Sequence, residues 1–121
     1  MRGEEHARRH LALLVVEDDE HFRRFVSIAL SLAGFTVQEA ADGASALREM
    51  ELQTPDVVSL YPMLPGIDGL AVIERASATI PVVLVTGSTL DVCGISAACV
   101  LRKPVTPDSV VRAVQKCLVV D

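Results

Sequence analysis

Short runs of valine-rich sequence, apolar on both faces, constrain the fold of this chain more than any other feature. A strand covered by helices on both sides of a sheet has this pattern, whereas a strand with one solvent face alternates apolar and polar residues. The runs therefore predict buried parallel strands at Leu11–Val16, Val57–Leu60, Val82–Val85 and the shorter Cys99–Leu101, with the more polar Thr36–Ala40 nearer an edge.

Helical periodicity fills the segments between these runs. The first such segment carries apolar residues at i, i+3, i+4, i+7 and i+8, which predicts one apolar stripe made of Phe22, Phe25, Val26, Ala29 and Leu30. Gly34 then provides a C-terminal stop. Later helices are indicated by Ala44, Leu47 and Met50 after Asp42 as N-cap, by Leu70, Ile73 and Ala76, and by Val110, Val111, Val114, Cys117 and Leu118 after Thr106 as N-cap and Pro107.

The alternation of strand and helix, repeated about five times, predicts an α/β fold with right-handed crossovers and a doubly wound parallel sheet. A chain of 121 residues fits one domain of this kind. Residues 1–10 are polar and of mixed charge, so we interpret them as a leader that precedes a domain over residues 11–119.

Composition excludes several classes of function. The net charge of −5 argues against nucleic-acid binding by this domain, which requires a basic face. Cys93, Cys99 and Cys117 form no CxxC pair and are typical of reduced, buried thiols. No stretch approaches the roughly 20 apolar residues of a membrane span, and the run after the N-terminal arginines is too short for a signal peptide. We therefore expect a cytoplasmic protein without a membrane partner.

Polar residues follow successive predicted strands, and parallel strands bring their carboxyl ends to one edge of the sheet, where ligands bind. The residues are Glu17–Asp19 after the first strand, Tyr61 after the third, Thr86 at the fourth and Lys103 at the fifth. Neighbouring carboxylates suit a hard cation such as Mg²⁺. A lysine and a hydroxyl group suit a phosphoryl group.

Each of these residues also has a simpler interpretation when it is taken alone. The acidic triplet could cap the following helix, the Thr86 hydroxyl could bond to backbone, and Lys103 could be a solvated charge. Gly66 and Gly69 are more typical of turns than of a phosphate cradle, because no GxGxxG or Walker pattern accompanies them. The placement on successive strand ends favours the functional interpretation.

Four segments together resemble the receiver domain of two-component response regulators: Leu14–Glu20, Pro55–Gly69, Pro81–Gly87 and Leu101–Pro104. The resemblance covers about residues 11–119. It implies a flavodoxin-like sheet with strand order 2-1-3-4-5, and a cis peptide bond before Pro104. It also implies an Mg²⁺ site at Glu17, Asp18 and the carbonyl of Met63, with Thr86 and Lys103 in the phosphoryl-site positions.

Three departures from the family pattern affect the mechanism. The resemblance places Tyr61 on the phospho-acceptor position, where the family has aspartate. Val100 stands where the family usually has a switching aromatic residue. Fewer residues than usual separate Thr86 from Lys103, so we expect a short or irregular fourth helix. Because the switch residue is missing, we expect this face to hold one conformation.

Tyrosine at the acceptor position removes the family reaction. A free phenol ionises only at about pH 10, so a tyrosine is a poor anionic ligand at neutral pH. The normal acyl-phosphate cannot form, and loss of one carboxylate weakens the Mg²⁺ site. The ring could imitate a phosphorylated aspartate sterically but poorly in charge. With no carboxylate at residue 61, we expect Lys103 to pair with Glu17 or Asp18.

We interpret the chain as a non-enzymatic receiver module that acts through protein contact and is not phosphorylatable at residue 61. A sensor histidine kinase or another signalling protein is the expected partner, and a homodimer is compatible with the pattern. The alternatives are a small phosphotransfer or ligand-binding enzyme on the same fold, and a structural dimerisation domain. The enzyme alternative lacks a Cys–His or Ser–His arrangement, since His6, His10 and His21 lie in the leader or early first helix. A natural pseudo-receiver and an acceptor-site mutant both fit; the retained pocket residues favour the second, or a recent loss of the acceptor.

Overall fold

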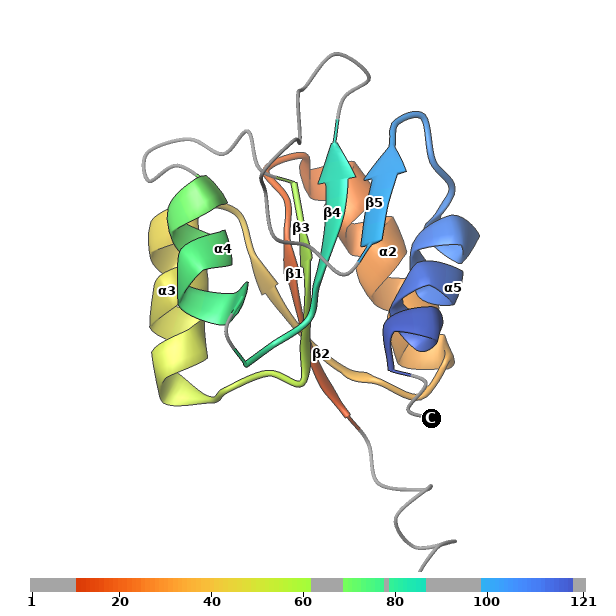
Figure 1. Cartoon of the computed structure of the whole chain (residues 1–121). Helices are drawn as coiled ribbons and strands as arrows, with labels where there is room; N and C mark the ends of the chain where they lie inside the picture. Colours follow the sequence, from red (N-terminus) through yellow and green to blue (C-terminus); the bar gives the residue numbers. More distant parts are fainter. Residues whose placement is uncertain (1–10, 62–68, 78, 87–98, 119–121) are drawn as a thin grey trace, which may run out of the picture.

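Five parallel strands form a single sheet in the computed structural model, in the order β2-β1-β3-β4-β5 (Figure 1). The structure describes residues 11–61, 69–77, 79–86 and 99–118. This order confirms the expected α/β, flavodoxin-like class. The strands are β1 (Ala12–Val16), β2 (Thr36–Ala40), β3 (Val57–Leu60), β4 (Val82–Thr86) and β5 (Cys99–Arg102).

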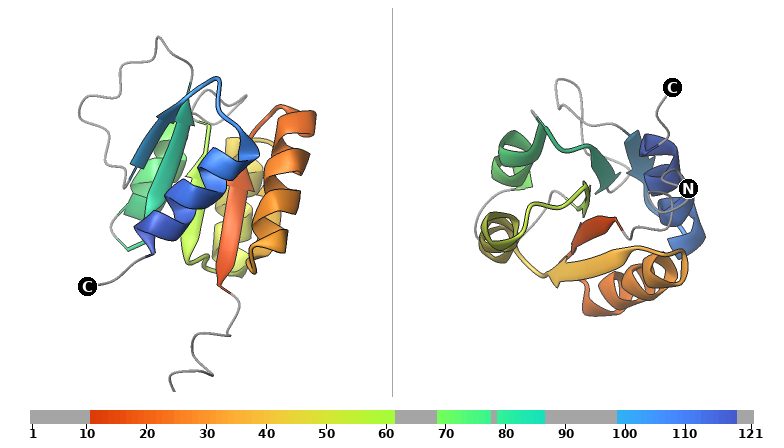
Figure 2. Two further views of the ribbon diagram at one scale, coloured as in Figure 1. Left: turned by 90° about the vertical axis from the view of Figure 1, so that its right-hand side faces the viewer. Right: turned by 90° about the horizontal axis from the view of Figure 1, so that it is seen from below.

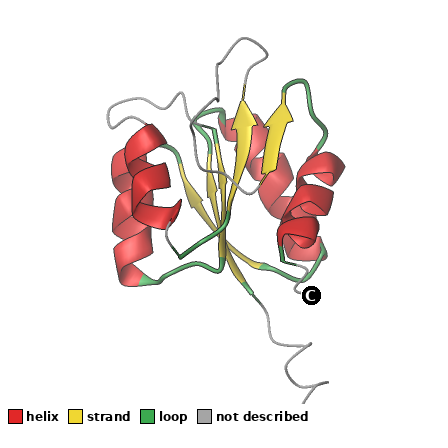
Figure 3. Ribbon diagram, viewed as in Figure 1, coloured by secondary structure: helices red, strands yellow, loops and turns green. Residues whose placement is uncertain are grey.

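Helices cover both faces of the sheet. One face carries α2 and α5, which pack against each other, and the opposite face carries α3 and α4 (Figures 2 and 3). This three-layer arrangement explains why the central strands contain no solvent-facing positions. The helices are α2 (Glu20–Leu32), α3 (Gly43–Leu52), α4 (Gly69–Ser77) and α5 (Pro107–Cys117).

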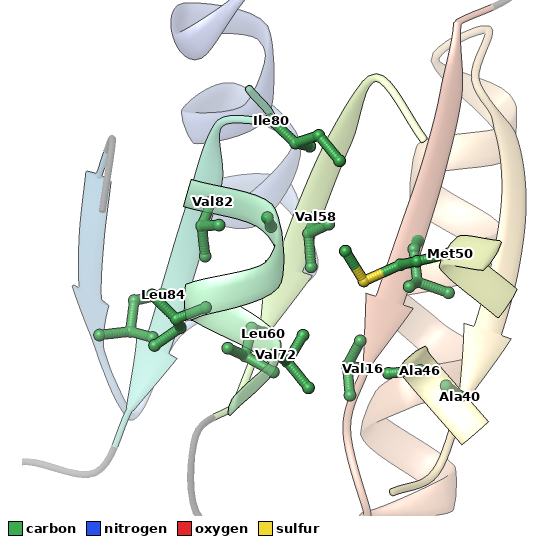
Figure 4. Close-up of a cluster of buried hydrophobic side chains, with 13 residues drawn as sticks. Val16, Ala40, Ala46, Met50, Val58, Leu60, Val72, Ile80, Val82 and Leu84 are labelled. Carbon is green, nitrogen blue, oxygen red and sulfur yellow. The ribbon is translucent and has the colours of Figure 1, made fainter. Parts of the chain in front are cut away.

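Two apolar clusters fill the interfaces between the sheet and its helices, one on each face. Successive residues of a strand point to opposite faces, so Leu13 and Val15 pack on the α2 and α5 side, whereas Leu14 and Val16 pack on the α3 and α4 side. The second side also contains Leu60, Leu84 and Met50 (Figure 4). The clusters are almost wholly aliphatic, as the low aromatic content requires.

The predicted helix ends are confirmed. The Asp42 carboxylate accepts a hydrogen bond of 2.7 Å from the Ser45 backbone N–H, and the Thr106 hydroxyl accepts one of 3.1 Å from the Ser109 N–H. Pro107 occupies the first turn of α5. Gly34 follows α2 with φ +107°, a left-handed conformation that favours glycine.

The apolar stripe predicted for the first helix is confirmed except at Phe25: Val26 and Leu30 are buried, and Phe22 packs against the same cluster. Phe25 is 62% exposed, and the buried residues of α2 are Val26, Ser27 and Leu30. Phe25 lies at the margin of the stripe and stays exposed because the sheet and α5 together cover only one side of the helix. Phe25, Ile28 and Leu32 are exposed and lie at i, i+3 and i+7, on the side of α2 opposite the core. In the same way, Ala44 of α3 is exposed while Ala46 is buried.

No helix in the described part of the chain is long and apolar enough to cross a lipid bilayer.

Candidate functional site

The carboxyl edge of the sheet brings together four of the predicted site residues: Glu17, Tyr61, Thr86 and Lys103. Backbone hydrogen bonds between neighbouring strand ends hold them in register. The Tyr61 N–H donates to the Val16 carbonyl at 2.9 Å, and the Lys103 N–H donates to the Thr86 carbonyl at 2.7 Å. The convergence predicted from the strand ends is therefore present. The Lys103–Pro104 peptide bond is cis, as the resemblance implies.

Glu17 and Lys103 form an ion pair at this edge. Lys103 Nζ lies 3.2 Å from Glu17 Oε1, where the carboxylate side chain is 4% exposed and the lysine side chain 29%. Burial raises the pKa of the Glu17 carboxyl, and the Asp19 N–H and the Lys103 charge oppose that rise. The pairing expected for Lys103 is confirmed with Glu17, and its interpretation as a simple solvated charge is wrong.

Two aromatic rings complete the surroundings of the Lys103 ammonium group. Lys103 Nζ lies 4.1 Å from the centroid of the Tyr61 ring and 4.9 Å from that of Phe22. Both distances are within the range of cation–π attraction. Sequence reasoning assigned Phe22 only to a core stripe. Its position in the first turn of α2, directly after the carboxyl end of β1, is the signal that could have placed it at this edge.

The acidic triplet divides into different roles. The Asp19 carboxylate caps α2 by accepting a 3.1 Å hydrogen bond from the Phe22 N–H, and this bond lowers the pKa of Asp19. Glu17 points into the site and Asp18 is exposed beside it. Capping is therefore confirmed for Asp19, whereas the buried Glu17 side chain lies at the carboxyl edge and its role as a metal ligand stays a prediction.

Arg23 supports the backbone of this corner, and sequence reasoning did not find it. Its Nη1 group donates to the Glu17 carbonyl at 2.8 Å, and its Nε group donates to Glu39 Oε1 at 3.0 Å. Arg24 Nε lies 3.7 Å from the other oxygen of Glu39. These contacts connect α2 and β2 to the end of β1, so they restrict the position from which the Glu17 side chain projects.

Thr86 is fully buried at the end of β4, and its Oγ1 atom has no hydrogen-bond partner among the described residues. The simpler interpretation of a hydroxyl bonded to backbone is therefore wrong for this part of the chain. A buried hydroxyl without a partner costs about 1–3 kcal/mol. Buried polar groups without a partner are few in native structures.

Several predicted features fall outside the described residues. They are the Met63 carbonyl, Gly66, Cys93 and the segment expected to form a short fourth helix. Val100 lies on β5 and is 38% exposed. Glu17 and Asp18 both lie at this edge, and no group of three histidine, cysteine, aspartate or glutamate side chains in the described chain is placed to hold a metal ion.

Comparisons with known proteins agree with this architecture. Residues 13–115 match the response regulator receiver domain. The transcriptional regulatory protein AfsQ1 of Streptomyces coelicolor is 37% identical over 83 residues, which cover 67% of this chain and 37% of AfsQ1. The DNA-binding dual master transcriptional regulator RpaA of Synechocystis is 37% identical over 79 residues, 61% of this chain and 33% of RpaA. The chain thus spans about a third of the length of these curated relatives.

Solved structures show the same fold. The chemotaxis response regulator CheY4 of Vibrio cholerae superposes with a TM-score of 0.82 at 25% identity, over 91% of this chain and 100% of that chain. A putative response regulator from Chloroflexus aurantiacus gives a TM-score of 0.80 at 29% identity, over 91% of this chain and 98% of that chain. With the family match over residues 13–115, these likenesses show that the chain belongs to the response regulator receiver domain family.

Proposed function

We propose that this receiver domain signals through protein contact and is not phosphorylated at Tyr61, the residue in the phospho-acceptor position. The observation that carries the proposal is the Tyr61 side chain itself: it follows β3 at the carboxyl edge, and its ring lies 4.1 Å from Lys103 Nζ. A receiver that accepts a phosphoryl group needs a carboxylate at this point of the sheet. A phenol has no carboxyl group and cannot form the acyl-phosphate.

The charge distribution at the edge supports the same conclusion. In a phosphorylatable site, the pocket lysine and the acceptor carboxylate would attract each other. Here the lysine contacts the face of the Tyr61 ring and pairs with Glu17 Oε1 instead. The positive charge is therefore compensated by the Glu17 carboxylate and the Tyr61 ring rather than by an acceptor aspartate.

A weakened Mg²⁺ site belongs to this proposal. Glu17 and Asp18, with the Met63 carbonyl, would hold the ion, which would supply charge neutralisation for an incoming phosphoryl group. Hard cations depend on the charge of their oxygen ligands, and one of the two carboxylates already has an ammonium group at 3.2 Å. We therefore expect the affinity for Mg²⁺ to be well below that of a site with three carboxylates.

The outer side of α2 provides an observation in favour of protein contact. Phe25, Ile28 and Leu32 are exposed there along one line of the helix. Large apolar side chains in a continuous exposed line are typical of protein interaction sites rather than of a solvated helix. A sensor histidine kinase or another signalling protein is the proposed partner.

Labelling with a phosphodonor tests the proposal directly. The protein is incubated with acetyl phosphate and Mg²⁺ and then measured by intact mass spectrometry beside Tyr61→Asp and Tyr61→Phe variants. We expect no phosphate on the wild type or on Tyr61→Phe. Tyr61→Asp should gain a hydroxylamine-labile phosphate, provided that Glu17, Asp18, Thr86 and Lys103 still act together. A stoichiometric, hydroxylamine-labile phosphate on the wild type would overturn the proposal.

A further inference from the structure

We propose that Glu17, Phe22 and Tyr61 form a cage around the Lys103 ammonium group, which holds the carboxyl edge in one arrangement without a metal ion or a phosphoryl group. We call these four residues the lysine cage. The inference rests on the proposed function, since it assumes that Tyr61 carries no phosphoryl group. It adds how the site is regulated. Lys103, which would bind a phosphoryl group, instead contacts side chains of the same domain.

The cage draws on elements that are distant in the sequence. Glu17 follows β1 and supplies a carboxylate oxygen at 3.2 Å from Lys103 Nζ. Phe22 lies in the first turn of α2 with its ring centroid at 4.9 Å, and Tyr61 follows β3 with its ring centroid at 4.1 Å. Lys103 follows β5. The cage therefore links the ends of three strands and one helix.

The rings are needed because the carboxylate alone leaves the ammonium group incompletely compensated. A lysine has three N–H donors, and its side chain here is only 29% exposed. Aromatic faces carry partial negative charge, and their attraction for a cation grows as water is excluded. The Phe22 and Tyr61 rings therefore supply compensation that a single carboxylate oxygen does not.

The cage also explains how Tyr61 can hold Lys103 without a carboxylate oxygen. Lys103 contacts the face of the Tyr61 ring, so the position of the ring matters and its hydroxyl group is dispensable. Thr86 Oγ1 remains buried without a partner among the described residues, so Lys103 and Tyr61 do not engage it. A ligand shifts a conformational equilibrium only if it binds the two states differently. A phosphoryl group would shift the equilibrium by binding Lys103. When Lys103 is held in the cage, it is not free to bind a phosphoryl group.

The chain offers a built-in control for a direct test, because it contains only two lysines, Lys103 and Lys116. Lys116 is exposed on α5, and no aromatic ring in the described chain lies over it. The full chain is treated with an amine-acylating reagent at fixed pH, and the rate at each lysine is measured by peptide mass spectrometry. We expect Lys103 to react several-fold more slowly than Lys116. Mg²⁺ with beryllofluoride should leave the Lys103 rate unchanged.

Substitutions separate the rings from the carboxylate. Tyr61→Leu and Phe22→Leu should each raise the Lys103 rate by roughly two- to fivefold, the factor that an ordinary cation–π contact supports. Tyr61→Phe keeps the ring and should leave the rate as in the wild type. An unchanged Lys116 rate and circular dichroism spectrum show that a variant is folded. Phe22→Leu serves as the second test if Tyr61→Leu does not fold.

Equal rates at the two lysines in the wild type would overturn the cage. So would a Lys103 rate that stays unchanged in a folded Tyr61→Leu or Phe22→Leu variant, or that rises on addition of Mg²⁺ with beryllofluoride. These failures are distinct from failure of the proposed function. A phosphate on wild-type Tyr61 in the phosphodonor experiment would contradict the proposed function, while slow acylation of Lys103 in the unmodified protein would still support the cage.

Discussion

Val16 and Glu17 are neighbours in the chain and both are almost fully buried, yet they belong to two different regions of the molecule. Val16 is part of an aliphatic cluster between the sheet and its helices, where contacts come from many side chains at once. Glu17 lies one residue further, at the carboxyl edge. Its carboxylate accepts hydrogen bonds from the Lys103 ammonium group and the Asp19 N–H, and the rings of Phe22 and Tyr61 contact the same ammonium group.

The two regions contribute differently to the stability of the domain and to the chemistry of the site. Dispersion and hydrophobic contacts in the interior are individually small and non-directional, so their sum sets the free energy of unfolding. The carboxyl edge depends on a few directional contacts. A change there should alter the chemistry of the site more than it alters the fold. Substitutions in the two regions should therefore differ in their effects on the free energy of unfolding.

The largest effect is expected in the interior. Leu84→Ala removes a fully buried side chain from the middle of β4 and should lower the free energy of unfolding by about 2–5 kcal/mol. Urea denaturation measures the loss. Leu52→Ala is the matched control, because Leu52 is 78% exposed at the end of α3 and should lose little. Similar losses in the two variants would contradict the assignment of Leu84 to the core.

Removal of the cation from the carboxyl edge should have an intermediate effect. Lys103→Met leaves the buried Glu17 carboxylate without its partner and should lower the free energy of unfolding by about 1–3 kcal/mol. Lys116→Met removes the other lysine from an exposed position and should be nearly neutral. Addition of Glu17→Gln to Lys103→Met should recover part of the loss. If it recovers none, the two side chains do not act as a pair.

A helix cap tests a contact that lies beside the edge and is purely local. Thr106→Ala removes the hydroxyl that accepts from the Ser109 N–H at the start of α5, which should cost about 1 kcal/mol. Thr106→Ser retains a hydroxyl and should stay close to the wild type. Thermal unfolding followed by circular dichroism is the measurement. A loss in Thr106→Ser as large as in Thr106→Ala would show that packing of the threonine methyl group matters, and not the cap.

The smallest effect concerns pH. The Ser45 N–H donates to the Asp42 carboxylate and lowers the pKa of Asp42 below its ordinary value. A lowered folded-state pKa contributes stability above the pKa of the unfolded chain, and that stability is lost as pH falls through the folded-state value. Asp42→Asn keeps a capping side chain without this titration. The acid side of its plot of urea midpoint against pH should therefore be flatter than that of the wild type, and parallel plots would contradict this role.

Features that depend on short stretches of chain were predictable from the sequence. The strand β3 was predicted at the observed residues Val57–Leu60, and the caps Asp42 and Thr106 were predicted correctly, because burial on both faces and capping leave local patterns. The convergence of Glu17, Tyr61, Thr86 and Lys103 followed from the rule that parallel strands end at one edge. The order of the strands came from the family resemblance, since the local pattern alone does not specify it.

Which side of each helix is buried depends on how the helices pack on the sheet. Phe25 belongs to an apolar pattern as good as that of Val26, yet only Val26 is buried, because the angle at which α2 lies on the sheet and α5 selects one side of the helix. The contact of Lys103 with the rings of Phe22 and Tyr61 has the same origin. The sequence determined which chemical groups reach the carboxyl edge. Their mutual orientation depends on side chains from separate elements packing together, and no local pattern encodes that.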